Sequence, residues 1–263
     1  ALELNKYAAA SFARNHSTRI KTIVGDINDE TIQRELFSAM AEGIEQVEPW
    51  VLVGGPPCQG FSIAGKRIVD DERNKLYKGF VRMVAYFKPR AFVMENVPNI
   101  LSIGGGVVKQ SILEDFQELG YNVETKVLLA SDYGVPQNRR RAVFVGLYNG
   151  VFDFNIPTVE HKVTTEEALG DLSEESIADK SSYPIAPSCD YQRLMRANSN
   201  EVWNHDITQH NEQTKRIIAL VPDGGNYKDL PKELQETRKV HIAWTRLNSQ
   251  KPSITIDTGH RHH

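Results

Sequence analysis

Three short segments of this 263-residue sequence combine residue types that can do covalent or acid–base chemistry. Cys58 follows two prolines and precedes Gln59-Gly60, so we expect its thiol to be held out on a rigid turn. Glu95 follows four apolar residues, so we expect its carboxyl group to be desolvated. Residues 139–141 are three consecutive arginines. A thiolate stabilised by nearby positive charge or backbone N–H groups is a nucleophile, and a carboxyl group near it can hydrogen-bond or move a proton.

Each of these positions also has an ordinary structural interpretation. A free cysteine such as Cys58 is often a small buried apolar residue. Glu95 could form an ion pair with an arginine, and the arginine run could be a solvated turn. Alternation along an extended chain predicts that Arg139 and Arg141 point to the same side as they enter the following strand. Local sequence alone leaves both interpretations open.

The same segments lie at the ends of predicted strands. The run 50–53 is apolar on both faces, as in a buried parallel strand, and Gly-Gly-Pro-Pro at 54–57 ends it. Ligands of open α/β sheets bind beyond the carboxyl ends of the strands, so we expect Asp26, Cys58, Glu95 and the arginines to converge there. The predicted strands cover 22–24, 50–53, 91–94, 123–129 and 142–147, and the predicted helices cover 4–12, 32–40, 76–87 and 107–119. This alternation predicts an open α/β sheet.

The second part of the chain has a different character. Beyond about residue 151 the apolar runs shorten, and polar residues dominate 173–199. We therefore predict two domains, a catalytic domain over 1–155 and a smaller, loop-rich domain over 156–263.

Composition excludes several classes of protein. With 40% hydrophobic and 25% charged residues the chain is globular rather than disordered or fibrous. It has neither an uninterrupted apolar run of membrane-helix length nor a secretory pattern, so we expect a soluble, cytoplasmic protein with no membrane partner. Lys plus Arg (31) minus Asp plus Glu (34) gives −3, which neither requires nor excludes a nucleic-acid partner. The two cysteines, Cys58 and Cys189, form no CxxC spacing, so we expect neither a disulfide scaffold nor a metal site.

Three motifs together resemble, in order and spacing, the catalytic motifs of the DNA (cytosine-5) methyltransferase family, in its bacterial restriction-modification form. They are Gly54-Gly55-Pro56-Pro57-Cys58-Gln59-Gly60-Phe61-Ser62, Met94-Glu95-Asn96-Val97 and Gln137-Asn138-Arg139-Arg140-Arg141. The resemblance covers nearly all of residues 1 to about 150. It implies an α/β fold with the Rossmann-like open sheet of S-adenosylmethionine-dependent methyltransferases and a smaller, loop-rich target-recognition domain.

The resemblance also implies a role for each site residue. Cys58 would add to C6 of a flipped-out cytosine, and Glu95 would hydrogen-bond N3 and the exocyclic amine of that base. Arg141 would contact the O2 side of the base, with electrostatic support from Arg139. The cofactor would be S-adenosylmethionine, and its binding residues would be Glu3, Asp26, Ile27, Pro57 and Leu76.

Double-stranded DNA is the partner that the resemblance implies. Positive and polar residues surround the stretch 61–74, which we expect to close over the flipped base and to contact phosphates; a solvated charged loop is the alternative. The predicted DNA-binding residues are Ser62, Lys66, Arg67 and Arg73. In the second domain, Trp203, Asn204, His205, Gly224, Gly225 and Asn226 are candidates for target recognition. We expect a monomer, with a cognate restriction endonuclease as its functional partner.

The sequence departs from the family pattern at both ends. The first strand with its glycine-rich loop is missing before Ala1, and no final motif follows residues 246–256. We therefore expect this polypeptide to bind S-adenosylmethionine weakly in calorimetry; the sequence leaves open whether it is active by itself. Two other hypotheses stand beside the first, a tRNA cytosine-5 methyltransferase and a catalytically inactive DNA-binding fragment. The joint presence of Cys58, Glu95 and Arg141 favours an enzyme.

Overall fold

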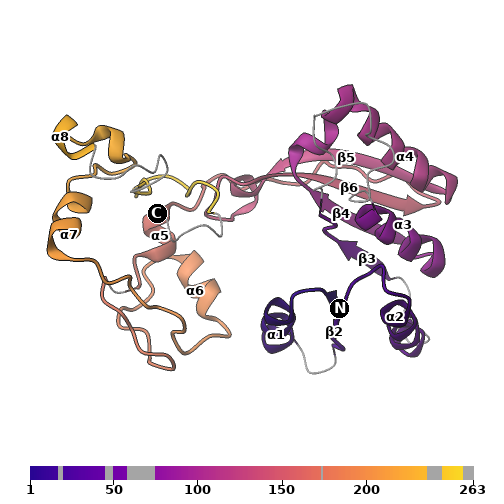
Figure 1. Ribbon diagram of the computed structural model, residues 1–263, viewed down its shortest axis with the longest axis horizontal. Helices are drawn as coiled ribbons and strands as arrows, with labels where there is room; N and C mark the ends of the chain where they lie inside the picture. Colours follow the sequence, from indigo (N-terminus) through magenta and orange to yellow (C-terminus); the bar gives the residue numbers. More distant parts are fainter. Residues whose placement is uncertain (17–19, 45–49, 58–74, 173, 236–244, 257–263) are drawn as a thin grey trace. The chain divides into compact units, whose positions relative to one another are not determined.

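The computed structural model describes residues 1–16, 20–44, 50–57, 75–172, 174–235 and 245–256 (Figure 1). The chain forms two compact units, which are described separately below. Unit 1 comprises Ala1–Leu128 and Arg140–Ile156, and unit 2 comprises Leu129–Arg139 and Pro157–His263.

Unit 1 contains an α/β arrangement in which strands and helices alternate along the chain. Its strands are β1 (Leu2–Glu3), β2 (Ile23–Val24), β3 (Val51–Gly54), β4 (Ala91–Asn96), β5 (Tyr121–Leu129, whose last residue belongs to unit 2) and β6 (Arg140–Tyr148). Its helices are α1 (Lys6–Asn15), α2 (Glu30–Ile44), α3 (Lys75–Phe87) and α4 (Val107–Glu118), with 3₁₀ turns at Pro98–Leu101 and Ile103–Gly106. The predicted open α/β class is confirmed.

The described strands form two sheets rather than one. Strands β1 and β2 make a parallel pair, and the larger sheet has the order β3-β4-β6-β5. Strand β3 runs parallel to β4, whereas β6 runs antiparallel to β4. The antiparallel direction of β6 has a consequence for the site, because the beginning of β6 then lies at the carboxyl end of β4.

The core of unit 1 lies on the face of the larger sheet that α3 and α4 cover (Figure 1). Phe92 and Met94 of β4 point into this core and are fully buried. Gly146 of β6 lies opposite Phe92, and a Cβ at this position would overlap the Phe92 ring. The ring therefore requires glycine there, and this contact fixes the register of β4 against β6.

The opposite face of β3 is open. Val51 and Val53 are 53% and 71% exposed, so the prediction that this apolar run is buried on both faces was wrong. An apolar run predicts that its side chains are buried, but it does not show what covers them. The described part of the chain covers only one face of this edge strand.

Unit 2 is loop-rich and has a small apolar core of Ile217, Val221 and Leu230. Its helices are α5 (Thr165–Leu169), α6 (Asp190–Arg196), α7 (Glu212–Ala219) and α8 (Lys232–Gln235), with 3₁₀ turns at Ala130–Tyr133 and Tyr227–Asp229. No helix in the described part of the chain has the length and the apolar character needed to cross a bilayer.

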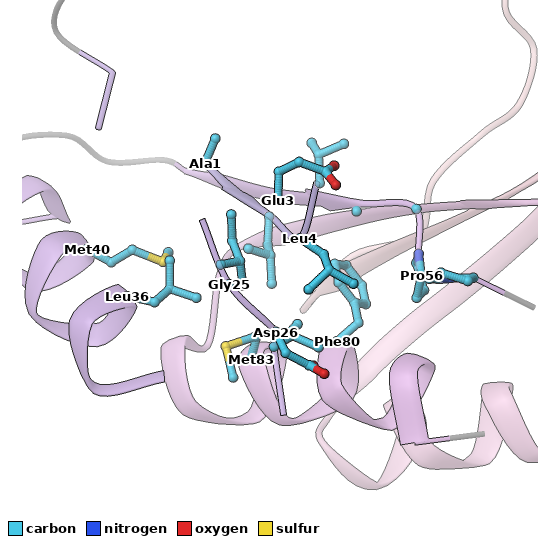
Figure 2. A pocket seen from close by; sticks show the side chains of 17 residues that line it. Ala1, Glu3, Leu4, Gly25, Asp26, Leu36, Met40, Pro56, Phe80 and Met83 are labelled. Carbon is cyan, nitrogen blue, oxygen red and sulfur yellow. The ribbon is translucent and has the colours of Figure 1, made fainter. Parts of the chain in front are cut away.

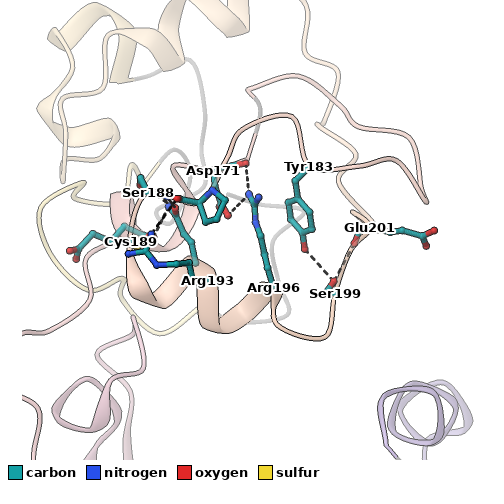
Figure 3. Close-up of polar contacts among 11 residues, drawn as sticks. Asp171, Tyr183, Ser188, Cys189, Arg193, Arg196, Ser199 and Glu201 are labelled. Atoms are coloured by element: carbon teal, nitrogen blue, oxygen red, sulfur yellow. Dashed lines mark hydrogen bonds and ion pairs between the residues drawn. The ribbon is translucent and has the colours of Figure 1, made fainter.

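Buried polar contacts supplement the small apolar core of unit 2 (Figure 3). Arg196 pairs with Asp171, and its guanidinium lies 3.8 Å from the centre of the Tyr183 ring. Gln192 is buried; its Oε1 accepts a 2.6 Å hydrogen bond from the Ser188 N–H, and its Nε2 donates to the carbonyl of Glu167 at 2.9 Å. Such buried networks are directional, so they specify how these loops pack on α6.

Candidate active site

A cavity of about 480 Å³ lies in unit 1 (Figure 2). Residues of β1, the turn after β2, β3 and the two prolines that follow β3 line its walls. Apolar side chains of α2 and α3, among them Leu36, Phe80 and Met83, complete the lining. The cavity includes residues at the carboxyl ends of β1, β2 and β3, where ligands bind in open α/β sheets.

Two carboxylates stand among the apolar walls of this cavity, and backbone groups hold both of them. Glu3 Oε1 accepts a 2.9 Å hydrogen bond from the Asn5 N–H, and Asp26 Oδ1 accepts a 2.8 Å hydrogen bond from the Asn28 N–H. Figure 2 shows Glu3 and Asp26 projecting from β1 and from the turn after β2. The site therefore combines fixed hydrogen-bond acceptors with an apolar surface.

Four of the five predicted cofactor-binding residues, Glu3, Asp26, Ile27 and Pro57, line this cavity. Leu76 is the second residue of α3, and its side chain lies outside the described part of the structure. Sequence reasoning did not select the apolar residues from α2 and α3, because helical periodicity marks them only as buried.

Glu95 and Arg141 meet at the carboxyl end of β4. Glu95 pairs with Val143 of β6, and Arg141 lies two residues earlier on the same face of that antiparallel strand. Arg141 Nε is 2.6 Å from Glu95 Oε1. The ion-pair interpretation of Glu95 is thus confirmed, whereas its predicted desolvation was wrong, since 46% of its side chain is exposed against 22% for Arg141. The pair lies at the end of the sheet, where fewer side chains cover it.

This ion pair lies beside the cavity. A Cβ at Gly55, which lines the cavity, would be 3.6 Å from Glu95 Oε2. The loop after β3 therefore passes close to the carboxylate, at a distance that a Cβ would also tolerate. The next residue of β4, Asn96, is buried and donates from Nδ2 to the carbonyl oxygen of Pro56 at 2.8 Å. Sequence reasoning quoted Asn96 only as part of a motif and gave it no role.

Arg139 belongs to unit 2, in a segment that the residues near 253 hold in place. The Asn138 N–H donates to the Ser253 carbonyl at 2.7 Å, and the Ser253 N–H donates to the Pro136 carbonyl at 2.9 Å. Ser131, which is fully buried, donates from Oγ to Asn138 Oδ1 at 2.8 Å. Arg139 is partly buried and Arg140 is exposed. That Arg139 and Arg141 point to the same side stays a prediction, because the two residues belong to different units.

The remaining predicted residues fall in two groups. Cys58, Ser62, Lys66, Arg67 and Arg73 lie outside the described residues. The target-recognition candidates belong to unit 2, where the Lys180 ammonium lies 5.5 Å from the centre of the Trp203 ring and the Asn204 N–H donates to Asp179 Oδ1 at 2.8 Å. Within the described ranges, no group of three or more His, Cys, Asp or Glu side chains is arranged to hold a metal ion.

An open α/β sheet with a mixed polar and apolar cavity at its strand ends is an arrangement in which nucleotide cofactors bind in many enzymes. A model of the C-5 cytosine-specific DNA methylase family matches residues 1–262, and the chain belongs to this family. The solved structure of a prophage-encoded protein (E. coli), described as a candidate DNA modification methyltransferase, has the same fold with a TM-score of 0.69. That likeness has 23% identity and covers 97% of this chain and 74% of the other.

Two curated relatives illustrate the family. The chain is 35% identical over 210 residues to the Type II methyltransferase M1.HphI of Haemophilus parahaemolyticus, covering 78% of this chain and 51% of the relative. It is 38% identical over 201 residues to the Type II methyltransferase M.DdeI of Desulfomicrobium norvegicum, covering 72% of this chain and 48% of the relative. The chain thus spans about half the length of these curated relatives.

Proposed function

We propose that the protein containing this chain transfers a methyl group from S-adenosylmethionine to C5 of a flipped-out cytosine in a specific DNA sequence, through a covalent adduct between Cys58 and C6. The observation that carries this proposal is the 2.6 Å pair of Glu95 and Arg141 beside the cavity. The pair lies next to Gly55, three residues before Cys58 in the sequence. Membership of the C-5 cytosine-specific family supports it.

The cavity fits the proposed cofactor. S-adenosylmethionine has ribose hydroxyls that donate hydrogen bonds and an adenine ring that packs on apolar side chains, and a volume of about 480 Å³ is in the range of small-molecule sites. We assign the ribose hydroxyls to Glu3 and the adenine to Asp26 and Ile27. We assign further cofactor contacts to Pro57 and Leu76. When bound, the cofactor supplies an electrophilic methyl group.

The protein side chains act on the cytosine. C5 is a poor nucleophile until the Cys58 thiolate adds to C6 and pushes electron density to C5. Glu95 hydrogen-bonds N3 and the exocyclic amine, which favours the ring protonated at N3 and therefore more electrophilic at C6. Arg141, oriented by Glu95, contacts the O2 side, and Arg139 adds positive charge. After the new C5–CH₃ bond forms, C5 loses its proton, the C6–S bond breaks, and Cys58 is released as a thiolate.

DNA would engage both parts of the chain. We assign phosphate contacts to Ser62, Lys66, Arg67 and Arg73, since cationic and hydroxyl side chains position a protein on the backbone without reading bases. We assign target recognition to the domain over 156–263 and catalysis to the domain over 1–155. The protein would act as a monomer in the bacterial cytoplasm, with a cognate restriction endonuclease cleaving the unmodified form of the same site.

Base-resolution bisulfite sequencing tests the proposal. In DNA from cells expressing the complete reading frame that encodes this chain, we expect modified cytosines in one short sequence context. Cys58→Ala should abolish them, because the adduct needs the thiolate. Cys189→Ala is the matched control: this thiol donates to the Glu167 carbonyl at 3.3 Å in unit 2, and its loss should leave methylation in place. Unmodified DNA from cells that contain folded protein would contradict the proposal, and modification of tRNA instead would favour the tRNA enzyme.

A further inference from the structure

The loop that leads to Cys58 has an unusual shortage of backbone donors. Strand β3 pairs with β4 from Val51 opposite Ala91 to Gly54 opposite Met94, and the pairing then stops. Two residues later come Pro56 and Pro57, neither of which has an N–H group. A parallel ladder cannot continue through two such residues, so another interaction must hold this loop against the sheet.

The side chain of Asn96 makes that interaction. Its Nδ2 donates to the Pro56 carbonyl at 2.8 Å, while its Oδ1 accepts a 2.9 Å hydrogen bond from the Val97 N–H. Because a carbonyl can only accept and an N–H can only donate, the two bonds together fix the orientation of the amide. Asn96 is 95% buried, with 5% of the residue exposed, so water competes little for either bond.

The last two residues of β4 therefore hold two different segments. Side chains alternate across a strand, so Glu95 faces Arg141 on one side of the sheet while Asn96 faces the core side and reaches Pro56. The Glu95–Arg141 ion pair and the hydrogen bond from Asn96 to Pro56 therefore fix the distance between the Glu95 carboxylate and the chain that enters Cys58.

We propose that Asn96 is a positioning residue for the nucleophile: by holding the Pro56 carbonyl, it fixes the direction in which the chain enters Pro57-Cys58 relative to Glu95. This inference rests on the proposed function, in which Cys58 and Glu95 act on the same cytosine. Misplacing a reacting group by about 1 Å lowers a rate roughly 100-fold, and a single lost anchor at a donor-poor loop permits such a shift.

Asn96→Asp is the sharpest test, because it keeps the size of the side chain and the acceptor for Val97 but places a carboxylate oxygen where the donor to Pro56 was. Asn99→Asp is the matched control: Asn99 is exposed, three residues further on, and accepts from Ser102 Oγ at 3.1 Å. In the complete protein with S-adenosylmethionine present, adduct formation is followed on duplex DNA whose target base is 5-fluorocytosine; once C5 carries the methyl group, fluorine leaves no C5 proton to lose, so the C6–S bond is retained.

We expect Asn96→Asp to lower the rate constant of adduct formation about 100-fold, with the affinity for DNA unchanged. Asn99→Asp should match the wild type. A merely structural role would lower the amplitude, the fraction of protein that reacts, and leave the rate constant unchanged. A rate constant within twofold of the wild type overturns the proposal.

A second readout needs no DNA. Mass spectrometry follows the iodoacetamide alkylation of Cys58, with Cys189 as the internal reference. We expect Asn96→Asp to change the alkylation rate of Cys58 and not that of Cys189; an unchanged Cys58 rate overturns the positioning role. If the wild type forms no adduct with DNA, the proposed function fails, and the alkylation result still decides whether Asn96 positions the Cys58 thiol.

Discussion

At the scale of single residues, Glu95 and Arg141 form an ion pair within unit 1, and we propose that the same two side chains act on the substrate base. An ion pair with one partner about half exposed contributes roughly 0–1 kcal/mol to stability. Sequence reasoning expected these residues to converge because Glu95 and the arginines each follow a predicted strand, and ligands of open α/β sheets bind beyond the carboxyl ends of the strands. It wrongly predicted that Glu95 is desolvated, because the four apolar residues before Glu95 indicate that the strand is buried inside the sheet but not that its end is buried.

Glu95→Gln and Arg141→Gln test whether this pair acts on substrate. Each should lower the methyl-transfer rate constant about 10²- to 10³-fold, because each removes a charged contact to the transition state. Each should change the unfolding free energy by less than about 1 kcal/mol in urea titrations. Arg34→Gln, which breaks the exposed 3.2 Å pair with Glu30 on α2, is the control and should leave the rate unchanged. If the loss of methyl-transfer rate constant tracked the loss of unfolding free energy in all three variants, the pair would have only a structural role.

At the scale of elements, the spacing of apolar residues and the positions of glycine and proline predicted most of the helices and strands that position the site. The predicted helices 76–87 and 107–119 correspond to α3 and α4, and the predicted strand 91–94 to the longer β4. The strand β1 was missed, because two residues are too few to show alternation. The direction of β6 was not predicted either, since apolar runs specify burial but not which neighbour a strand pairs with.

Helix α5 offers a test at this scale. Thr164 and Glu167 form a capping box, in which the Thr164 N–H donates to Glu167 Oε2 at 2.8 Å and the Glu167 N–H donates to Thr164 Oγ1 at 3.2 Å. The backbone bond from Thr164, and after it the bond with His161, hold the pKa of Glu167 below its ordinary value of 4.5. A carboxyl whose pKa is lowered by folding adds stability above its unfolded value and loses it as the pH falls through the folded value.

We therefore expect Glu167→Gln to lower the unfolding free energy by about 0.5 kcal/mol at pH 7, since glutamine keeps the hydrogen bond and loses the charge at the helix N-terminus. The difference from the wild type should shrink as the pH falls below 4.5. Urea denaturation at a series of pH values measures it. Glu160→Gln, at an exposed position, is the control and should show no such trend. A difference that grows towards acid would contradict the assignment.

At the scale of the whole molecule, the two units differ in how they are held together. Unit 1 has an extensive aromatic and aliphatic core around Phe92, Phe116 and Phe144, whereas unit 2 combines a small cluster at Ile217 with buried polar contacts such as Asp171 with Arg196. The polar composition of 173–199 predicted a loop-rich unit. It could not predict the Asp171 pair, because partners 25 residues apart in irregular loops leave no periodic signal.

Hydrogen exchange should show this difference directly. We expect the amides of β4 and β6 to exchange slowest, because their opening requires disruption of the large core, and the amides of α7 to exchange much faster. Mass spectrometry of peptides after deuterium labelling of the complete protein measures both in one sample. Equal protection of α7 and β4 would contradict this expectation.

The chain passes between the two units three times, after Leu128, after Arg139 and after Ile156. A single recombination event that replaced everything after Ile156 would leave Asn138 behind while removing its partner Ser253, together with the return bond to Pro136. Genes of this architecture therefore cannot exchange unit 2 as one uninterrupted cassette. Replacement of the whole of unit 2 has to exchange two separate stretches, 129–139 and the residues from 157 onward, and to leave 140–156 in place between them. Because both bonds join backbone groups, the incoming chain also has to follow the same backbone path at position 253.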